Sequence, residues 1–227
     1  MVKKEMNTAR IIALTQPIRT EEFNFELNMT AEDLLAYCAR VSNPQNQMTL
    51  ETAPKLLKYL IKNKHWSPFE MVHIVMEITT TRDIARQILR HRSFSFQEFS
   101  QRYADPTKDL GFTTREARLQ DTKNRQNSIE TDDEGIQNMW KTKQDHLQWA
   151  AKDAYDWAIE NGIAKEQARA VLPEGLTVST MYMAGSLRSW IHYCELRMGN
   201  GTQKEHREVA FSAWNEIAKQ FPSIIGE

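Results

Sequence analysis

Hydrophobic and polar residues alternate in three stretches before residue 80, and each stretch predicts a β-strand. The first covers residues 9–15, and the second is the short set Phe23, Phe25 and Leu27. The third is the longest, and one of its faces is formed by Val72, Ile74, Met76 and Ile78. Successive side chains of a strand point to opposite faces, so His73 is expected on the polar face.

Apolar residues recur at three- and four-residue spacing in the rest of the chain, which predicts helices. Thr30 and Asp33 have the spacing of a capping box, which predicts a helix from Thr30 to about Arg40. A short helix around Arg169 must stop near Leu172, because the residue before a proline disfavours helical geometry. The other expected helices cover residues 52–61, 81–89, 143–161, 179–197 and 203–220.

The two longest expected helices differ in the faces that they would bury. Helix 143–161 is expected to bury Leu147, Ala150, Ala154, Trp157 and Ala158. Helix 179–197 is expected to bury Met181, Met183, Leu187, Trp190, Ile191 and Cys194. Residues 105–138 are polar and irregular, which predicts a long loop, and loops of that length are usually lids, interface arms or mobile segments.

Length and composition fit one globular domain over residues 1–227. A formal net charge of -1 argues against general nucleic-acid binding, which usually needs a basic face. No apolar run approaches the roughly 20 residues that span a bilayer, so a cytoplasmic protein is expected. Cys38 and Cys194 fall inside helical patterns and cannot form a disulfide framework, and their spacing argues against a metal site.

Cations are concentrated between Arg90 and Arg102, where three arginines and a histidine fall within thirteen residues. Charge patterning alone would make this segment a solvated helix end. The chain carries three further arginines on expected helices, namely Arg169, Arg188 and Arg197. The whole set exceeds what a solvated face requires and indicates a site for an anionic, phosphate-bearing ligand.

Other side chains near these cations suit a nucleotide. Ser95 and Ser100 offer hydroxyl donors, and Gln87 offers the paired donor and acceptor that match the amide edge of a pyrimidine. Arg188 and Arg197 are nine residues apart, so at about 100° per residue they face opposite sides of a straight helix and would serve two sites. A single-stranded nucleic-acid module built on residues 90–103 is an alternative that the net charge disfavours.

Residues 90–102 resemble the RHRxxSxNxxSxR signature of the flavin-dependent thymidylate synthases, with Gln97 where that signature has Asn. The resemblance extends over most of the chain. Further matches, in the family's order, are Ala39-Arg40-Val41-Ser42, His65-x-Ser67-Pro68-Phe69-Glu70, Ala85-Arg86-Gln87, residues 168–173, Arg188-Ser189 and Leu196-Arg197.

The resemblance implies an α/β (mixed α+β) fold with a central, mostly antiparallel sheet flanked by long helices. It implies conversion of dUMP to dTMP with methylenetetrahydrofolate as carbon donor, FAD as redox carrier and NADPH as reductant. It also implies a homotetramer with active sites at subunit interfaces. In this family no cysteine attacks dUMP, which agrees with the expected core positions of both cysteines.

The same resemblance assigns roles by motif position. The expected flavin contacts are Ser42, Ser67, Arg90, His91, Arg92, Glu98, Arg188 and His192. The expected dUMP contacts are Gln87, Glu98, Ser100, Arg102, Arg169 and Arg197. The expected catalytic residues are His65, for methyl transfer, with Ser100 and Arg197, and a cation such as Arg197 would stabilise charge that develops on the uracil.

Several positions depart from the family pattern besides Gln97. Met71 and Gly201 stand where relatives often have His, and Ser186 and His192 where they often have Asn. These substitutions motivate an alternative function, a nucleotide-binding protein of the same fold without flavin chemistry.

Overall fold

The computed structural model describes residues 5–18 and 29–224. Its main sheet has the strand order β1-β2-β6-β3, and every neighbouring pair is antiparallel. The bounds are Thr8–Leu14 for β1, His73–Thr81 for β2, Ser95–Glu98 for β3 and Val178–Ser186 for β6. The fold class expected from the resemblance is thus confirmed. The strand expected at Phe23, Phe25 and Leu27 lies outside the described residues.

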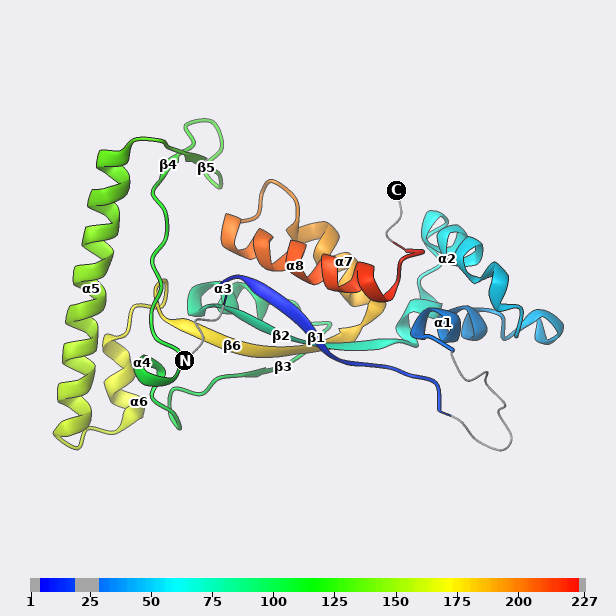
Figure 1. Ribbon diagram of the computed structural model, residues 1–227, viewed down its shortest axis with the longest axis horizontal. Coiled ribbons are helices and arrows are strands. Elements are labelled where there is room, and N and C mark those ends of the chain that lie inside the picture. The colour runs from blue at the N-terminus through cyan, green and yellow to red at the C-terminus, as the bar shows by residue number, and fades with distance from the viewer. Residues whose placement is uncertain (1–4, 19–28, 225–227) are drawn as a thin grey trace.

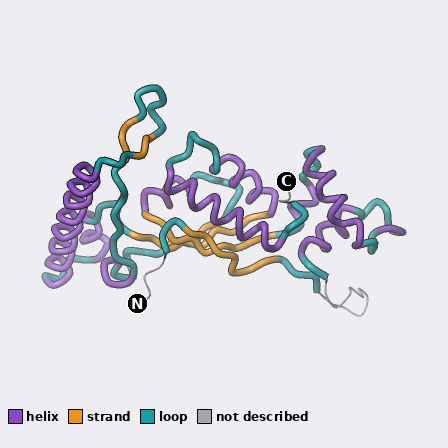
Figure 2. Tube along the Cα trace, turned by 45° about the horizontal axis from the view of Figure 1, so that its top comes forward, coloured by secondary structure: helices purple, strands orange, loops and turns teal. Residues whose placement is uncertain are grey.

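Helices cover one face of this sheet (Figures 1 and 2). The helices on this face are α3 (Arg82–Ile88), α7 (Leu187–Arg197) and α8 (Lys204–Gln220), whereas α1 (Ala31–Ala39) and α2 (Ala53–Lys62) lie beyond one end of the sheet (Figure 1). The capping box of α1 is present, since the Thr30 side chain accepts from the Asp33 amide and the Asp33 carboxylate accepts from the Thr30 amide.

The core lies between the sheet and α7 and α8. The alternating residues Ile74, Met76 and Ile78 of β2 are fully buried, as their spacing predicts. They form one cluster with Met181 and Met183 of β6 and with Trp190 of α7. Each such fully buried side chain stabilises the fold by about 1.5–3 kcal/mol, so this layer fixes where α7 lies.

The expected helix at 179–197 is wrong in its first half, because residues 178–186 form strand β6 and the helix begins at Leu187. The buried residues were identified correctly, since Met181, Met183, Leu187, Trp190, Ile191 and Cys194 are all buried. Met181 and Met183 are two residues apart, which is a strand period, and β6 pairs with β2 along its whole length.

The segment after β3 is more structured than a loop. It contains α4 (Pro106–Asp109), the hairpin strands β4 (Arg118–Gln120) and β5 (Ser128–Glu130), and the start of α5 (Glu134–Glu160). Helix α5 begins nine residues before the predicted start, with the side chain of Asp133 as its N-cap. It is followed by α6 (Lys165–Ala168), and Gly162 takes the positive φ of 77° that ends such a helix.

The buried face predicted for α5 is largely wrong. Of the five expected core residues only Ala158 is buried, while Leu147 and Trp157 are about half exposed or more, at 51% and 60%. The residues that α5 buries are Gln144, Ala151, Tyr155 and Ala158. Figure 1 shows α5 standing at one end of the molecule, away from the helices on the sheet.

Among the described residues, no helix is long and apolar enough to cross a membrane. In that same part of the chain, no group of three or more His, Cys, Asp or Glu side chains is arranged to hold a metal ion. Cys38 and Cys194 are both free thiols, and burial raises the pKa of Cys194 far above its usual value.

Candidate active site

The segment from Arg90 to Arg102 begins where α3 ends and continues into β3, the edge strand beside β6. Phe94 anchors it: the ring is buried against Trp190 and Tyr193 of α7. A Cβ atom on Gly185 of β6 would lie 2.5 Å from the Phe94 ring. Glycine at this position therefore lets the cationic segment approach the sheet.

Glu98 is held by two donors at the end of this segment. Its Oε1 atom accepts from Arg82 Nη1 at 3.1 Å and from Ser179 Oγ at 2.8 Å. Arg82 is almost buried and was missed by the sequence reasoning, because nothing in its spacing linked it to Glu98. Gln97 lies on the opposite, uncovered face of β3, where it pairs with Tyr182 across the strands.

The first group of expected site residues gathers where α3 meets α7. Arg197 Nε donates to His91 Nε2 at 2.9 Å. Burial first, and then the charges of Arg197 and Arg90, lower the pKa of His91 to about 4, so its ring is neutral at pH 7. Gln87 of α3 is linked to this pair by His206, whose Nδ1 lies 3.3 Å from Gln87 Oε1 and whose ring centroid lies 6.3 Å from that of His91. The guanidinium of Arg197 thus has a neutral acceptor and no carboxylate partner among the described residues.

A second group lies at the other end of α7. Arg188 Nη1 donates to Glu70 Oε1 at 2.7 Å. Hydrogen bonding from Ser186, and then from Arg188, holds the pKa of Glu70 below its usual value. His192 packs edge-on against Trp66 with ring centroids 4.6 Å apart. Ser42 and His65 are exposed in the connections after α1 and α2, and Ser67 is exposed at the start of the 3-10 helix Ser67–Glu70, which also carries Glu70.

A third group lies around α6. Arg102 Nη2 is 3.1 Å from Glu166 Oε2, and both side chains are about half exposed. Lys165 Nζ also donates to the carbonyl of Tyr103. Arg169 follows α6 directly, at the start of a short 3-10 turn over Arg169–Val171. Ser100 is half-buried beside Arg102.

The group around Arg188 and the group around α6 lie at opposite ends of β6. The α6 group precedes β6 and the Arg188 group follows it, so a strand of nine residues, about 27 Å long, separates their elements. Arg188 and Arg197 contact different elements, in agreement with their spacing on the helix. Among the described residues, no hydrogen bond or ion pair joins Gln87 or Arg197 to Arg102 or Arg169.

Arg90 and Arg92 lie exposed after α3, and neither has an ion-pair partner among the described residues. A cavity of about 480 Å³, within the range of small-molecule sites, lies between the β4–β5 hairpin and the start of α8. Arg125 and Arg207 line it without a salt bridge to any described residue, and Gln203 also lines it.

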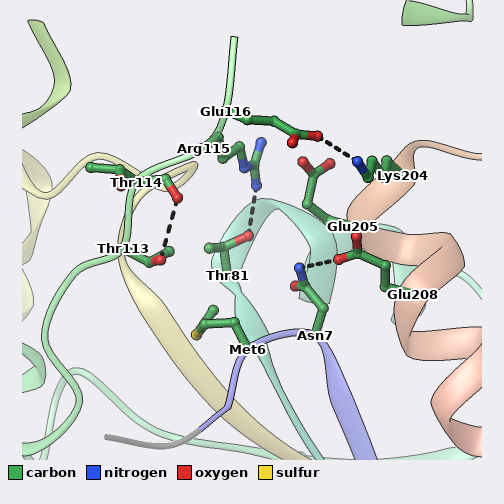
Figure 3. Close-up of a pocket in the computed structure, with 10 residues that line it drawn as sticks. All are labelled: Met6, Asn7, Thr81, Thr113, Thr114, Arg115, Glu116, Lys204, Glu205 and Glu208. Carbon is green, nitrogen blue, oxygen red and sulfur yellow. Dashed lines mark hydrogen bonds and ion pairs between the residues drawn. The ribbon is translucent and has the colours of Figure 1, made fainter. Parts of the chain in front are cut away.

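A smaller pocket beside Thr81 is of about 180 Å³ and contains none of the expected site residues. Figure 3 shows that polar side chains cross it and bond to one another. Arg115 donates to Thr81 Oγ1 at 2.7 Å, Asn7 donates to Glu208 at 2.8 Å, and Lys204 pairs with Glu116 at 2.7 Å. This pocket therefore joins β1, β2 and α8 and is too small for a nucleotide.

The sequence reasoning also missed two residues that contact Gln87, namely Gln203 and His206. Gln203 accepts from Gln87, and His206 contacts Gln87 on one side of its ring and Tyr193 on the other. His206 is fully buried, although it was treated only as part of an amphipathic helix. The sequence did contain one indication of these contacts. Three polar residues, Gln203, Glu205 and His206, fall together at the start of a helix that is otherwise expected to bury apolar residues.

Comparison with known proteins identifies the family of the chain. The family model described as "Thymidylate synthase complementing protein" matches residues 26–223. A protein of Paramecium bursaria Chlorella virus 1 named "Probable flavin-dependent thymidylate synthase" is 50% identical over 96% of this chain and 96% of its own length. The flavin-dependent thymidylate synthase of Synechocystis sp. is 47% identical, over 95% of this chain and 96% of its length.

A solved structure shares the fold. The UMP/dUMP methylase PolB from Streptomyces cacaoi, bound with 5-Br UMP, superposes with a TM-score of 0.77 over 96% of this chain and 91% of that chain. The two sequences are 22% identical, so this likeness supports the fold alone.

Proposed function

Because this chain belongs to the flavin-dependent thymidylate synthase family, we propose that it methylates dUMP to dTMP, with methylenetetrahydrofolate as carbon donor and NADPH as reductant. The observation that carries the proposal is the Arg197–His91 pair, which His206 links to Gln87. A cation with a neutral partner, near a side-chain amide, suits an anionic pyrimidine nucleotide.

The arginines would bind the nucleotide by charge. Arg102 and Arg169 would take the phosphate with Ser100, since guanidinium forks match phosphate oxygens. Gln87 and Arg197 would contact the uracil, where Arg197 would stabilise negative charge that develops on the ring. Glu98 has Oε1 occupied by Arg82 and Ser179, which leaves Oε2 for a ligand.

The residues present fit a flavin dinucleotide. Arg90 and Arg92 are exposed cations on one turn without ion-pair partners among the described residues, which suits a pyrophosphate. His91, Ser42, Ser67, Arg188 and His192 would complete the cofactor contacts. FAD supplies the reducing equivalents when bound, and His65, exposed in the loop after α2, would act near the transferred carbon.

We also propose that the active unit is a homotetramer whose sites lie between subunits. No hydrogen bond or ion pair among the described residues joins Gln87 and Arg197 to Arg102, and a complete site would combine such residues from different copies. Helix α5 supplies a surface for association, because exposed apolar residues cover it: Ile136, Met139, Trp140, Leu147, Trp149 and Trp157. Light scattering after size exclusion should give about four times the subunit mass of 26.5 kDa.

The test is direct. Purified protein should be yellow, and it should release tritium from 5-tritiated dUMP only when methylenetetrahydrofolate and NADPH are both present. Colourless protein that still binds dUMP would instead support a nucleotide-binding protein without flavin chemistry. That alternative is favoured by one observation, the side chain of Gln97 in place of Asn, on the uncovered face of β3.

A further inference from the structure

Two side chains hold the amide of Gln87. Its Nε2 atom donates to Gln203 Oε1 at 2.8 Å, and its Oε1 atom lies 3.3 Å from His206 Nδ1. Gln203 is the N-cap residue of α8, and His206 lies in the first turn of that helix. Both atoms of the Gln87 amide are therefore engaged by one helix start, while the residue stays partly exposed to a ligand.

The partners of Gln203 decide which way its own amide points. Gln203 Nε2 donates to Glu205 Oε2 at 2.9 Å, and Glu205 Oε1 accepts from Arg118 at 2.5 Å. Burial opposes ionisation of Glu205, but hydrogen bonds from its own backbone and from Gln203, with Arg115 and Arg118 nearby, outweigh it and lower the pKa. An ionised carboxylate only accepts hydrogen bonds. Gln203 must therefore present its nitrogen to Glu205 and its oxygen to Gln87.

The orientation of the Gln87 amide in turn sets the tautomer of His206. Burial first, and then the charges of Arg197 and His91, lower the pKa of His206 to about 3, so the ring is neutral and carries one N–H. Gln87 presents its oxygen to this ring, so Nδ1 must hold the proton. His206 Nε2 then accepts from the hydroxyl of Tyr193 at 3.1 Å. Burial raises the pKa of Tyr193 far above its usual value, so the hydroxyl keeps its proton.

The hydrogen bonds thus run in one direction, from Tyr193 through His206, Gln87 and Gln203 to Glu205. Aligned donors and acceptors strengthen one another in a buried network. Turning the Gln87 amide over would place its oxygen against the Gln203 oxygen, so that hydrogen bond would be lost, and the His206 proton would have to move from Nδ1 to Nε2. We name this series of five residues the amide relay.

We propose that the amide relay locks the Gln87 amide in one orientation, so that Gln203 and His206 are positioning residues that make the site select a uracil over a cytosine ring. This inference rests on the proposed function, because it takes Gln87 as the residue that reads the base. Uracil presents an N3–H donor beside the O4 acceptor, and cytosine presents an N3 acceptor beside the N4 amino donor. The two patterns are reversed, so an amide that cannot turn over accepts only one of them.

Glu205→Gln is the sharpest variant, because it keeps the size of the side chain and removes the group that can only accept. The matched control is Glu208→Gln, one turn further along α8, whose carboxylate accepts from Asn7 outside the amide relay. His206→Leu removes the donor to Gln87 and serves as the second variant if Glu205→Gln does not fold. The measurement is calorimetric titration of the flavin-loaded full-length protein with dUMP and with dCMP.

Wild-type protein should prefer dUMP to dCMP by roughly tenfold or more, the discrimination expected for a paired hydrogen bond to a base. Glu205→Gln and His206→Leu should each lower that ratio of dissociation constants by about tenfold, and Glu208→Gln should keep it. The ratio is measured within one protein, so a reduced folded fraction changes the binding stoichiometry and not the ratio.

A wild-type protein that binds both nucleotides equally would overturn the inference. An unchanged ratio of dissociation constants in folded Glu205→Gln would also overturn it, because a merely structural role would weaken the binding of both nucleotides equally. If Glu205→Gln does not fold, the same result in His206→Leu would overturn it. Absence of dUMP binding to wild-type protein would instead overturn the proposed function, and the inference with it.

Discussion

The two ends of helix α7 each carry an arginine, and the two arginines have opposite surroundings. Arg188, near the start, is partly exposed and pairs with the carboxylate of Glu70. Arg197, at the end, donates to the neutral ring of His91, and the buried ring of His206 lies nearby. One charge is balanced inside the subunit, while the other is not.

This difference separates a cation that is already paired from one that is available to a ligand. Leaving a charged group without a counter-charge in a half-buried place costs free energy, and folds retain such a group where an anion binds. The charge of Arg197 also helps to keep His91 and His206 neutral. The end of α7 whose arginine has no carboxylate partner among the described residues is therefore the end that we assign to the nucleotide.

The largest effect is expected at the unbalanced end. Arg197→Ala should weaken dUMP binding by roughly a hundredfold, because hydrogen bonds to charged groups contribute about 1.5–3 kcal/mol each. Calorimetric titration measures this change, and Arg197→Lys should recover part of the affinity by keeping the charge. Affinity that stays within a factor of two in Arg197→Ala would remove the distinction between the ends.

The stability of the protein at acidic pH should depend on His206, which lies near the Arg197 end of α7. The folded pKa of His206 is about 3, below its unfolded value of about 6.5. The unfolded chain therefore binds the proton first, so the stability contribution is complete above pH 6.5 and is lost as the pH falls towards the folded value.

The slope due to His206 should approach about 1.4 kcal/mol per pH unit below pH 6.5. Urea unfolding between pH 6.5 and 5 measures it, and His206→Asn should make the dependence shallower by that amount. Equal slopes in the two proteins would show that His206 is protonated in the folded state.

A variant of Arg102 tests the third group of expected site residues, the one around α6. Arg102→Ala should weaken dUMP binding by at least tenfold, or about 1.4 kcal/mol, because a phosphate contact is lost. Its partner provides the control, since Glu166→Gln removes the competing carboxylate 3.1 Å away and should not weaken dUMP. Unchanged affinity in Arg102→Ala would contradict the phosphate role.

The smallest effect is expected at the balanced end. Glu70→Gln should lower the free energy of unfolding by less than about 1 kcal/mol, because both partners of this ion pair are partly exposed. Urea unfolding of the variant measures it. A loss of several kcal/mol would mean that Glu70 and Arg188 form a buried structural pair. The contrast between a partly exposed, paired Arg188 and an available Arg197 would then be wrong.

Local patterns predicted the parts of the fold that depend on neighbouring residues. The capping box at Thr30 and the alternating face of Ile74, Met76 and Ile78 were both confirmed. The period of residues 178–186 was misjudged, because Met181 and Met183 continue into an apolar helix and only pairing with β2 makes this segment a strand. The face of α5 was misjudged because its large apolar residues lie outward.

In the candidate site, too, features that depend on residue type or neighbouring residues could be predicted, and features that depend on distant contacts could not. The cationic segment and the further arginines could be predicted as an anion site from the sequence, because their number exceeds what a solvated face requires. The amide relay could not, since Gln87 and Gln203 are 116 residues apart and meet only when α8 packs beside α3. Orientation of an amide depends on partners that sequence spacing does not identify.

The outward tryptophans of α5 give the protein an optical reporter. Three of its six tryptophans, Trp140, Trp149 and Trp157, are 45%, 71% and 60% exposed on that one helix, whereas Trp190 is fully buried. Water around an excited indole shifts its emission to longer wavelength, so this helix would dominate the red part of the fluorescence spectrum. Covering α5 with another subunit would move the emission to shorter wavelength, and dilution would reverse the shift at the concentration where the subunits separate.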